Sequence, residues 1–296
     1  MVAASPEIEL EVAPSRRYES TLRRKVRSVG RWRDIIVPAT VFVLIALTCW
    51  IWPAIYPLRS PTVGSLSDTL IRPGTHGYLL GTDALGIDQF SRLLYGGRVS
   101  IEVGFGAMGI GLVLGGTLGA IAGFYSGPLE AVIMRTFDMF FAFPPLVLAL
   151  VIANYLGPSE LHVIWAISFV SVPSFARLSR AATLAVRDQT FVLASSLLGT
   201  KARRTLRRHV VPNALPSLVT FACINMATAI VVEAALSFLG LGIPQPGASW
   251  GNMIASGESY LAKAPWLIFI PSGAIFLTVM SLNMLGDALR ARWGTL

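Results

Sequence analysis

The feature that most constrains the fold is a series of long apolar runs, each separated from the next by a polar segment. About 20 apolar residues cross the hydrocarbon core of a bilayer as a helix. Six segments reach this length, and the sequence predicts a transmembrane helix in each: 35–58, 99–124, 131–156, 161–184, 214–239 and 266–289. Charged residues make up 14% of the chain, against roughly 25% in soluble domains. We therefore expect an all-α membrane protein.

Positive charge divides the polar segments into two groups. With six spans both termini lie on one side, and 19 of the 24 Lys and Arg residues fall on that side. Because cytoplasmic loops carry an excess of Lys and Arg, we expect N- and C-termini in the cytoplasm. Residues 1–34 are then a basic cytoplasmic tail, 59–98 an extracytoplasmic connection, 187–213 a cytoplasmic loop and 291–296 a cytoplasmic end. This arrangement explains the net charge of +8 without nucleic acid as a partner.

The residue patterns of enzymes and metalloproteins are missing. His76, His162 and His209 are isolated, with no metal-ligand spacing to each other or to cysteine. Cys49 and Cys223 lie inside apolar runs, where a thiol acts as a small hydrophobic group. The phosphate-binding pattern GxxxxGK[ST] is absent, so if ATP powers this protein, another polypeptide must bind the ATP. We expect no catalytic residue, metal site or cofactor on this chain.

Four ionisable residues fall within the predicted spans. Charge is costly in a bilayer, so such residues are candidate functional sites. Glu102, Arg135 and Asp138 lie near predicted span ends, where a side chain can reach the interface. Glu233 lies deeper and is the candidate for lining a polar pathway, with a structural hydrogen bond or ion pair as the alternative.

Proline and glycine predict two local features of the spans. The pair Pro144-Pro145 removes two backbone donors, so the span at 131–156 should bend or break there. Glycine recurs every fourth residue in the span at 99–124, at Gly111, Gly115, Gly119 and Gly123. Such a stripe lets a second helix approach closely.

The loop at 187–213 is a polar interruption between two spans. It begins with a run that can form one short helix, and Gly199 then breaks the run. A basic block follows, formed by Lys201, Arg203, Arg204, Arg207 and Arg208. We expect a helical element against the cytoplasmic face of the membrane, where a partner outside the membrane docks.

Three stretches together resemble the C-type permease subunits of bacterial peptide and nickel ABC importers. They are LGTDALGIDQFSRLLYGGRVS at 80–100, the loop at 187–213, and ALSFLGLGIPQPGASWG at 235–251 continued by LGDAL at 285–289. Ile87 stands where the family pattern has arginine. The resemblance covers about residues 75–290. It implies a type I ABC importer (MetI-like) permease fold, with the transmembrane core at 99–290.

The resemblance also implies a role for the loop. In that family the loop carries the motif EAAxxxG and forms a coupling helix that sits in a groove of the ATPase subunit. The frame here is 193–199, in which Ala194 and Gly199 match, whereas Leu193 replaces the glutamate and Ser195 the second alanine. The continuation HVVPNALP, which includes Pro212, matches closely. A leucine in place of glutamate suggests that the ATPase groove that receives this helix is more apolar.

The function implied is that of a permease subunit forming half of an ATP-driven import pathway, with di- or oligopeptides as cargo. Nickel or another small solute such as haem is an alternative cargo, and a secondary carrier an alternative mechanism. The implied partners are a second, homologous permease, cytoplasmic ATPases that bind ATP and Mg²⁺, membrane lipid and an external substrate-binding protein. The binding protein would contact 59–98 and 240–265. The implied location is the bacterial cytoplasmic membrane, crossed several times.

Overall fold

The structure is a computed structural model that describes residues 17–294, with side chains described from Trp32 onward. The predicted basic tail and C-terminal end therefore fall partly outside the described residues, at 1–16 and 295–296. The ordered elements are helical: α1 Arg17–Ile55, η1 Leu66–Asp68, α2 Gln89–Ile110, η2 Gly111–Gly115, α3 Gly116–Tyr125, α4 Gly127–Phe140, α5 Pro145–Leu156, α6 Glu160–Arg187, α7 Thr190–Leu197, α8 Ala202–Thr205, η3 Leu206–Val210, α9 Val211–Phe238, α10 Trp250–Gly257, η4 Glu258–Tyr260 and α11 Trp266–Trp293.

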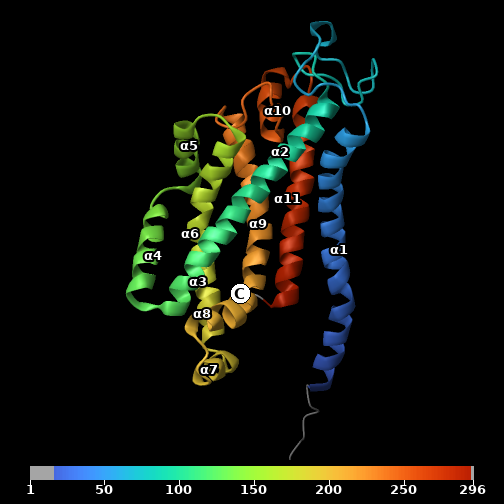
Figure 1. The fold of residues 1–296 in the computed structure, drawn as a ribbon. Coiled ribbons are helices and arrows are strands. Elements are labelled where there is room, and N and C mark those ends of the chain that lie inside the picture. Colours follow the sequence, from blue (N-terminus) through green and yellow to red (C-terminus); the bar gives the residue numbers. More distant parts are fainter. Residues whose placement is uncertain (1–16, 295–296) are drawn as a thin grey trace, which may run out of the picture.

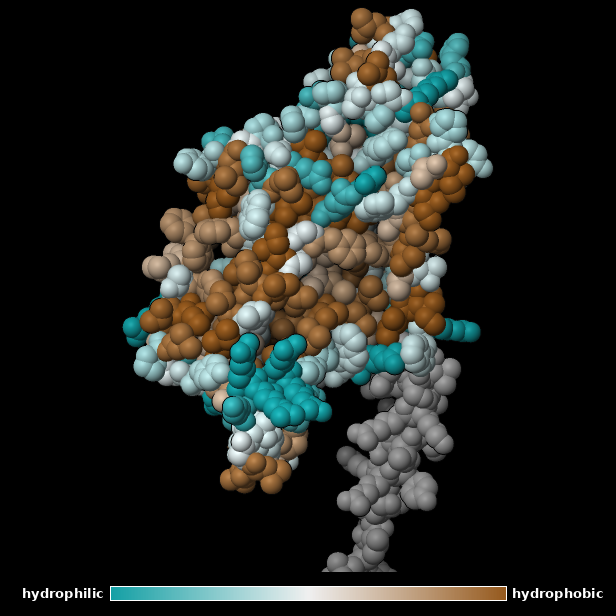
Figure 2. Space-filling model, viewed as in Figure 1, coloured by the Kyte–Doolittle hydropathy of each residue, from teal (hydrophilic) through white to brown (hydrophobic). Residues whose placement is uncertain are grey.

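Long apolar helices dominate the described part of the chain. Five are long and apolar enough to cross a membrane, and the bent pair α4–α5 makes up to six. A brown apolar belt crosses the middle of the face shown in Figure 2, as expected for a surface in contact with lipid tails. The prediction of an all-α chain with membrane-spanning helices is confirmed.

Several helices begin earlier than the hydropathy pattern indicates. α1 begins at Arg17, inside the segment predicted as a tail. α2 begins at Gln89, inside the predicted connection, because the Asp88 carboxylate caps the helix by accepting a hydrogen bond from the Ser91 N–H at 2.9 Å. A helix also begins at Ala202, inside the predicted loop, and continues through η3 into α9. Polar residues can therefore be helical outside the apolar belt, where hydropathy gives no signal.

The predicted break at the proline pair is confirmed. α4 ends at Phe140, α5 begins at Pro145, and the two axes differ by 84°. Pro144 and Pro145 have no N–H to donate to the preceding turn, so the helix cannot continue through them. In Figure 1 these two helices form one edge of the bundle.

The glycine stripe packs against α6. A Cβ at Gly123 would lie 2.7 Å from the carbonyl oxygen of Arg180, and Cβ atoms at Gly115 and Gly119 would collide with the α6 backbone at Val172 and Ala176. The close helix approach predicted from this stripe is therefore correct. It holds α3 and α6 together as one unit.

The remaining helices complete the bundle. α9 packs on α2, α6 and α11, and α1 packs on α11 and α2 at the edge opposite α4 and α5 (Figure 1). One end of the bundle, the α10 end, carries α10 and the connection 56–88. The other, the α7 end, carries α7, the start of α1 and the C-terminal end of α11.

Candidate functional site

α7 projects from its end of the bundle beyond the apolar belt (Figures 1 and 2). Only Val192 of this helix is buried in the described chain. Leu193 is 52% exposed and Leu197 is 89% exposed, and both face solvent. Ala194 is exposed and Ser195 is half-buried. Apolar side chains that face water outside the belt mark a surface for another protein.

Gly199 ends this helical segment by its backbone conformation. Its φ is +77°, a region that residues with a side chain rarely adopt. The turn is closed by the Gly199 N–H donating to the Ser196 carbonyl at 3.0 Å and by the Thr200 N–H donating to the Ser195 carbonyl at 3.2 Å. A Cβ on Gly199 would meet no atom within 4 Å, so glycine is required for its conformation and not for space.

Arg187 anchors the end of α6, from which the chain leads into α7. Its guanidinium Nη1 donates to the Gly123 carbonyl at 3.1 Å and to the Ser126 hydroxyl at 2.6 Å. The last turn of α6 is thereby attached to the turn between α3 and α4. The sequence marks Arg187 only as the first residue of the loop, and its partners more than 60 positions earlier leave no local signal.

The basic block forms the first turns of the long helix after α7. Its five Lys and Arg side chains are exposed, and a hydrophilic cluster lies between the belt and the tip of the molecule where α8 is placed (Figure 2). Pro212 lies in the first turn of α9 and has no N–H for the preceding turn. The π-helix η3 lies directly before it, and the Asn213 side-chain amide donates to the His209 carbonyl at 2.6 Å. The helix thus passes a proline without breaking.

Glu233 lies in α9 and is completely buried. Its carboxylate accepts hydrogen bonds from the Ser100 hydroxyl of α2 at 2.8 Å and from the Ser237 hydroxyl at 2.7 Å. The Ser100 oxygen in turn accepts from the Trp250 N–H of α10 at 3.3 Å. The carboxylate therefore joins three helices.

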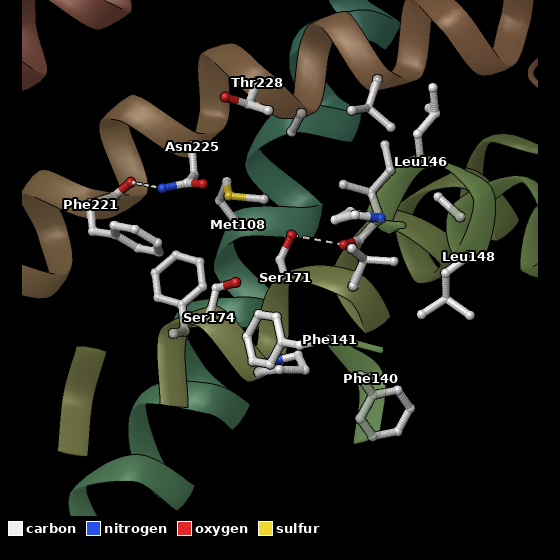
Figure 3. A pocket seen from close by; sticks show the side chains of 18 residues that line it. Met108, Phe140, Phe141, Leu146, Leu148, Ser171, Ser174, Phe221, Asn225 and Thr228 are labelled. Atoms are coloured by element: carbon white, nitrogen blue, oxygen red, sulfur yellow. Dashed lines mark hydrogen bonds between the residues drawn. The ribbon is translucent and has the colours of Figure 1, made fainter. Parts of the chain in front are cut away.

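A cavity of about 240 Å³ lies between α2, the α4–α5 break, α6 and α9. Its lining is largely apolar, with four polar side chains. Figure 3 shows Asn225 and Thr228 on α9 across from Ser171 and Ser174 on α6. Ser171 donates to the Ile167 carbonyl at 2.8 Å and Asn225 to the Phe221 carbonyl at 2.9 Å. Glu233 does not line this cavity.

The other ionisable residues predicted in the spans form ion pairs. Glu102 pairs with Arg98 at 2.9 Å, one turn away on α2. Asp138 of α4 pairs with Arg177 of α6 at 2.7 Å. Arg135 lies near the latter pair, in a second cavity between α4 and α6.

A buried polar cluster organises the α10 end, and sequence reasoning did not assign it. The Arg92 guanidinium pairs with Asp83 at 2.5 Å, and both side chains are almost inaccessible, at 2% and 6%. Asp83 also accepts from the backbone N–H groups of Leu85 and Ile87, while Arg92 donates to Asn252 of α10 at 3.2 Å. Ile87, the departure from the family pattern, is 1% exposed and belongs to this packed cluster. The stretch 80–100 thus builds a rigid connection.

Within the described residues, no group of three or more His, Cys, Asp or Glu side chains is arranged to hold a metal ion. The distinctive features of the described structure are the exposed helix α7, the cavity at the broken span and the buried polar cluster of the α10 end.

The sequence matches a protein-family model described as "Binding-protein-dependent transport system inner membrane component" over residues 115–294. The chain belongs to this family. Members of this family are permease components of transport systems in a membrane. The apolar helices of this chain cross that membrane several times.

Curated relatives in the family match almost the whole chain. The dipeptide transport system permease protein DppC of Alkalihalophilus pseudofirmus is 36% identical over 92% of this chain and 86% of its own. The glutathione transport system permease protein GsiD of Pectobacterium atrosepticum is 36% identical over 90% and 91%. The oligopeptide transport system permease protein OppC of Bacillus subtilis is 34% identical over 89% of each.

Solved structures agree on the fold. A chain of an amino acid ABC transporter aligns with a TM-score of 0.55 and 19% identity, covering 69% of this chain and 94% of its own. A chain of the MetNI methionine ABC transporter aligns with a TM-score of 0.56 and 19% identity, covering 68% and 96%. The family shares the type I ABC importer permease fold, which confirms the fold expected from the sequence.

Proposed function

We propose that this chain is one permease subunit of an ATP-driven importer and forms half of its pathway for di- or oligopeptides. The named relatives support this cargo, because those described above are permeases for dipeptides, glutathione or oligopeptides. Peptides and glutathione share amide groups and charged ends. Nothing in the described structure favours nickel, haem or the mechanism of a secondary carrier over this proposal.

The observation that carries the proposal is the exposed helix α7. α7 is a short helix outside the belt with Leu193 and Leu197 facing solvent, and this apolar surface would dock in a groove of a cytoplasmic ATPase. Leu193 would add apolar contact where the family motif supplies a glutamate. Ala194 and Ser195 would complete the docking surface, while Gly199 and Pro212 would set the direction of the chain that leaves it.

The orientation follows from charge. The α7 end carries the basic block and both ends of the described chain, so we place it in the cytoplasm. The membrane is then the bacterial cytoplasmic membrane. The α10 end would receive an external binding protein on the connections 56–88 and 240–265.

A second, homologous permease would complete the pathway. None of the α4 side chains is buried by the described part of the chain, and the break after α4 is exposed. Irregular backbone at membrane depth is tolerated only against protein or a water-filled cavity. The edge formed by α4 and α5 would therefore face the second permease and the pathway between them, rather than lipid.

Alternating access would couple these parts. The partner ATPases would bind ATP and Mg²⁺, and their closure would move α7; this chain itself would bind no cofactor. α7 follows α6 directly, the last residue of α6, Arg187, is bonded to the turn between α3 and α4, and α6 lines the cavity at the broken span. Differential docking of α7 in the two states would supply the conformational work. We assign Glu233 the role of holding α2, α9 and α10 together beside this pathway.

The test is purification of the complex and its reconstitution in liposomes with labelled L-alanyl-L-alanine as cargo. We expect a second permease and ATPase to co-purify, and uptake to require ATP. Leu197→Asp should reduce ATPase retention at least about tenfold, because it places a charge in an apolar contact. Leu66→Asp is the matched control, since Leu66 is 80% exposed at the α10 end. A lone chain that transports without ATP would refute the proposal.

A further inference from the structure

A cavity of about 520 Å³ between α4 and α6 is lined by five charged side chains. They are Glu130, Arg135 and Asp138 on α4 and Arg177 and Arg180 on α6. Arg177 pairs with Asp138 at 2.7 Å, and Arg180 pairs with Glu130. Three arginines thus meet two carboxylates, and the pairs bridge two helices that otherwise pack loosely. The cavity is open on the described chain.

The position of Arg177 along α6 gives the depth of these charges in a bilayer centred on that helix. α6 spans 28 residues from Glu160 to Arg187, so its midpoint lies beside Pro173. Arg177 is therefore displaced from the helix midpoint by only about 5 Å at 1.5 Å per residue. The hydrocarbon core extends roughly 15 Å to either side of its centre. With α6 centred in the bilayer, the ion pair between Arg177 and Asp138 lies within the core, deeper than the interface expected for Asp138 from its place near a predicted span end.

Exposure at this depth determines what the face can contact. The side chain of Arg177 is 57% exposed and that of Asp138 is 60% exposed. Charged side chains inside a membrane face protein or water, because lipid tails cannot solvate them. The exposed backbone break after Phe140 leads to the same conclusion for the same edge of the bundle. Both observations indicate that this edge of the bundle faces protein or a water-filled path rather than lipid tails.

The ion pair also adjoins the cavity at the break. Arg177 lies over the Phe141 ring at 4.0 Å, and Phe141 lines that first cavity. Asp138 precedes Phe141 by three residues, so both lie on one face of the chain. The ion pair of the second cavity is therefore linked to the first cavity through the Phe141 ring.

We propose that Asp138 and Arg177 are cargo-contacting residues of the pathway and that they bind the oppositely charged ends of a zwitterionic peptide by exchanging partners with it. The Arg177 guanidinium takes the peptide carboxylate, and Asp138 takes the ammonium group. Arg180 and Glu130 repeat the arrangement nearer the α7 end, Arg180 one turn along α6 and Glu130 about two turns along α4. This inference takes its cargo, a peptide, from the function proposed above and rests on that proposal.

Charge-selective labelling of single cysteines in the reconstituted complex tests the inference. Cys49→Ala and Cys223→Ala provide the background, to which Asp138→Cys or Arg177→Cys is added. The probes are an anionic and a cationic methanethiosulfonate reagent, both water-soluble. An Asp138→Cys thiol beside the freed guanidinium attracts the anion, and an Arg177→Cys thiol beside the freed carboxylate attracts the cation. The anion-to-cation rate ratio should be higher at position 138 than at 177 by at least about tenfold.

Control variants distinguish a cargo-contacting ion pair from a purely structural one. Val43→Cys on the apolar face of α1 should react slowly with both probes. ATP-driven uptake of L-alanyl-L-alanine should fall at least about tenfold in Asp138→Asn and Arg177→Gln at unchanged yield of the complex. Arg177→Lys should retain most uptake. Glu102→Gln, which breaks an exposed pair near the α10 end, should retain uptake as well.

Equal rate ratios, labelling as slow as at Val43→Cys, or unchanged uptake in the neutral variants would each overturn the inference. A wild-type complex that fails to import the dipeptide, with the expected labelling ratios, would instead refute the proposed cargo and leave the charged path supported. The two failures are therefore distinguishable.

Discussion

The buried ion pair at the α10 end gives the sharpest prediction for single residues. Asp83→Asn keeps the shape of the side chain but leaves the Arg92 guanidinium buried without a countercharge. Breaking a buried pair costs about 3–5 kcal/mol, so the apparent melting temperature of the purified complex should fall clearly in tryptophan fluorescence. Glu102→Gln is the control, because an exposed pair contributes about 0–1 kcal/mol. Equal melting of the two variants would show that the buried pair does not hold this end.

Residues of this kind also show where sequence reasoning stops. The sequence marks the stretch 80–100 as a motif, yet one hydrogen-bond partner of Arg92, Asn252, lies 160 positions further along the chain. No local pattern connects two side chains so far apart. Glu233 stands out in the sequence because a carboxylate in an apolar run is unusual, and its burial follows from that setting. Its bond to Ser237, four residues on, follows from helical spacing, whereas its bond to Ser100 required the fold.

Among the helical elements, the contact between α3 and α6 is set by the space at each glycine. Gly119→Ala would place a methyl group against the Ala176 backbone, which cannot move aside as a side chain can. Gly116→Ala, one turn earlier in α3, would meet only side-chain carbons at 3.8 and 3.9 Å. We expect the first change to cost about 1–3 kcal/mol through overpacking and the second to be neutral or stabilising.

Thermal unfolding of the two variants in detergent checks this prediction, and ATP-driven uptake shows whether the contact transmits motion from α7. If Gly119→Ala unfolds like Gly116→Ala, the two helices do not approach as closely as the structure places them.

The elements were predictable where a residue acts locally. The break between α4 and α5 follows from two missing N–H groups, and the glycine stripe follows from a spacing of four. The first residues of the helices were less predictable, because hydropathy gives no signal for polar residues that are helical outside the apolar belt. The start of α2 depends on the cap at Asp88, and the helix that begins at Ala202 consists of exposed basic residues. The exposed face of α7 required the fold, since its sequence is apolar around most of the helix.

For the molecule as a whole, the uneven distribution of positive charge predicts its orientation in the membrane. In the cysteine-free background, Val63→Cys reports the α10 end and Ala291→Cys the α7 end; Val63 is 72% exposed and Ala291 is also exposed. Because the basic side of a membrane protein stays in the cytoplasm, a membrane-impermeant maleimide added to spheroplasts should label Val63→Cys and spare Ala291→Cys. Inverted vesicles should give the opposite result. The reverse pattern would place α7 outside the cell, where no ATPase could reach it, and would refute both the orientation and the coupling role.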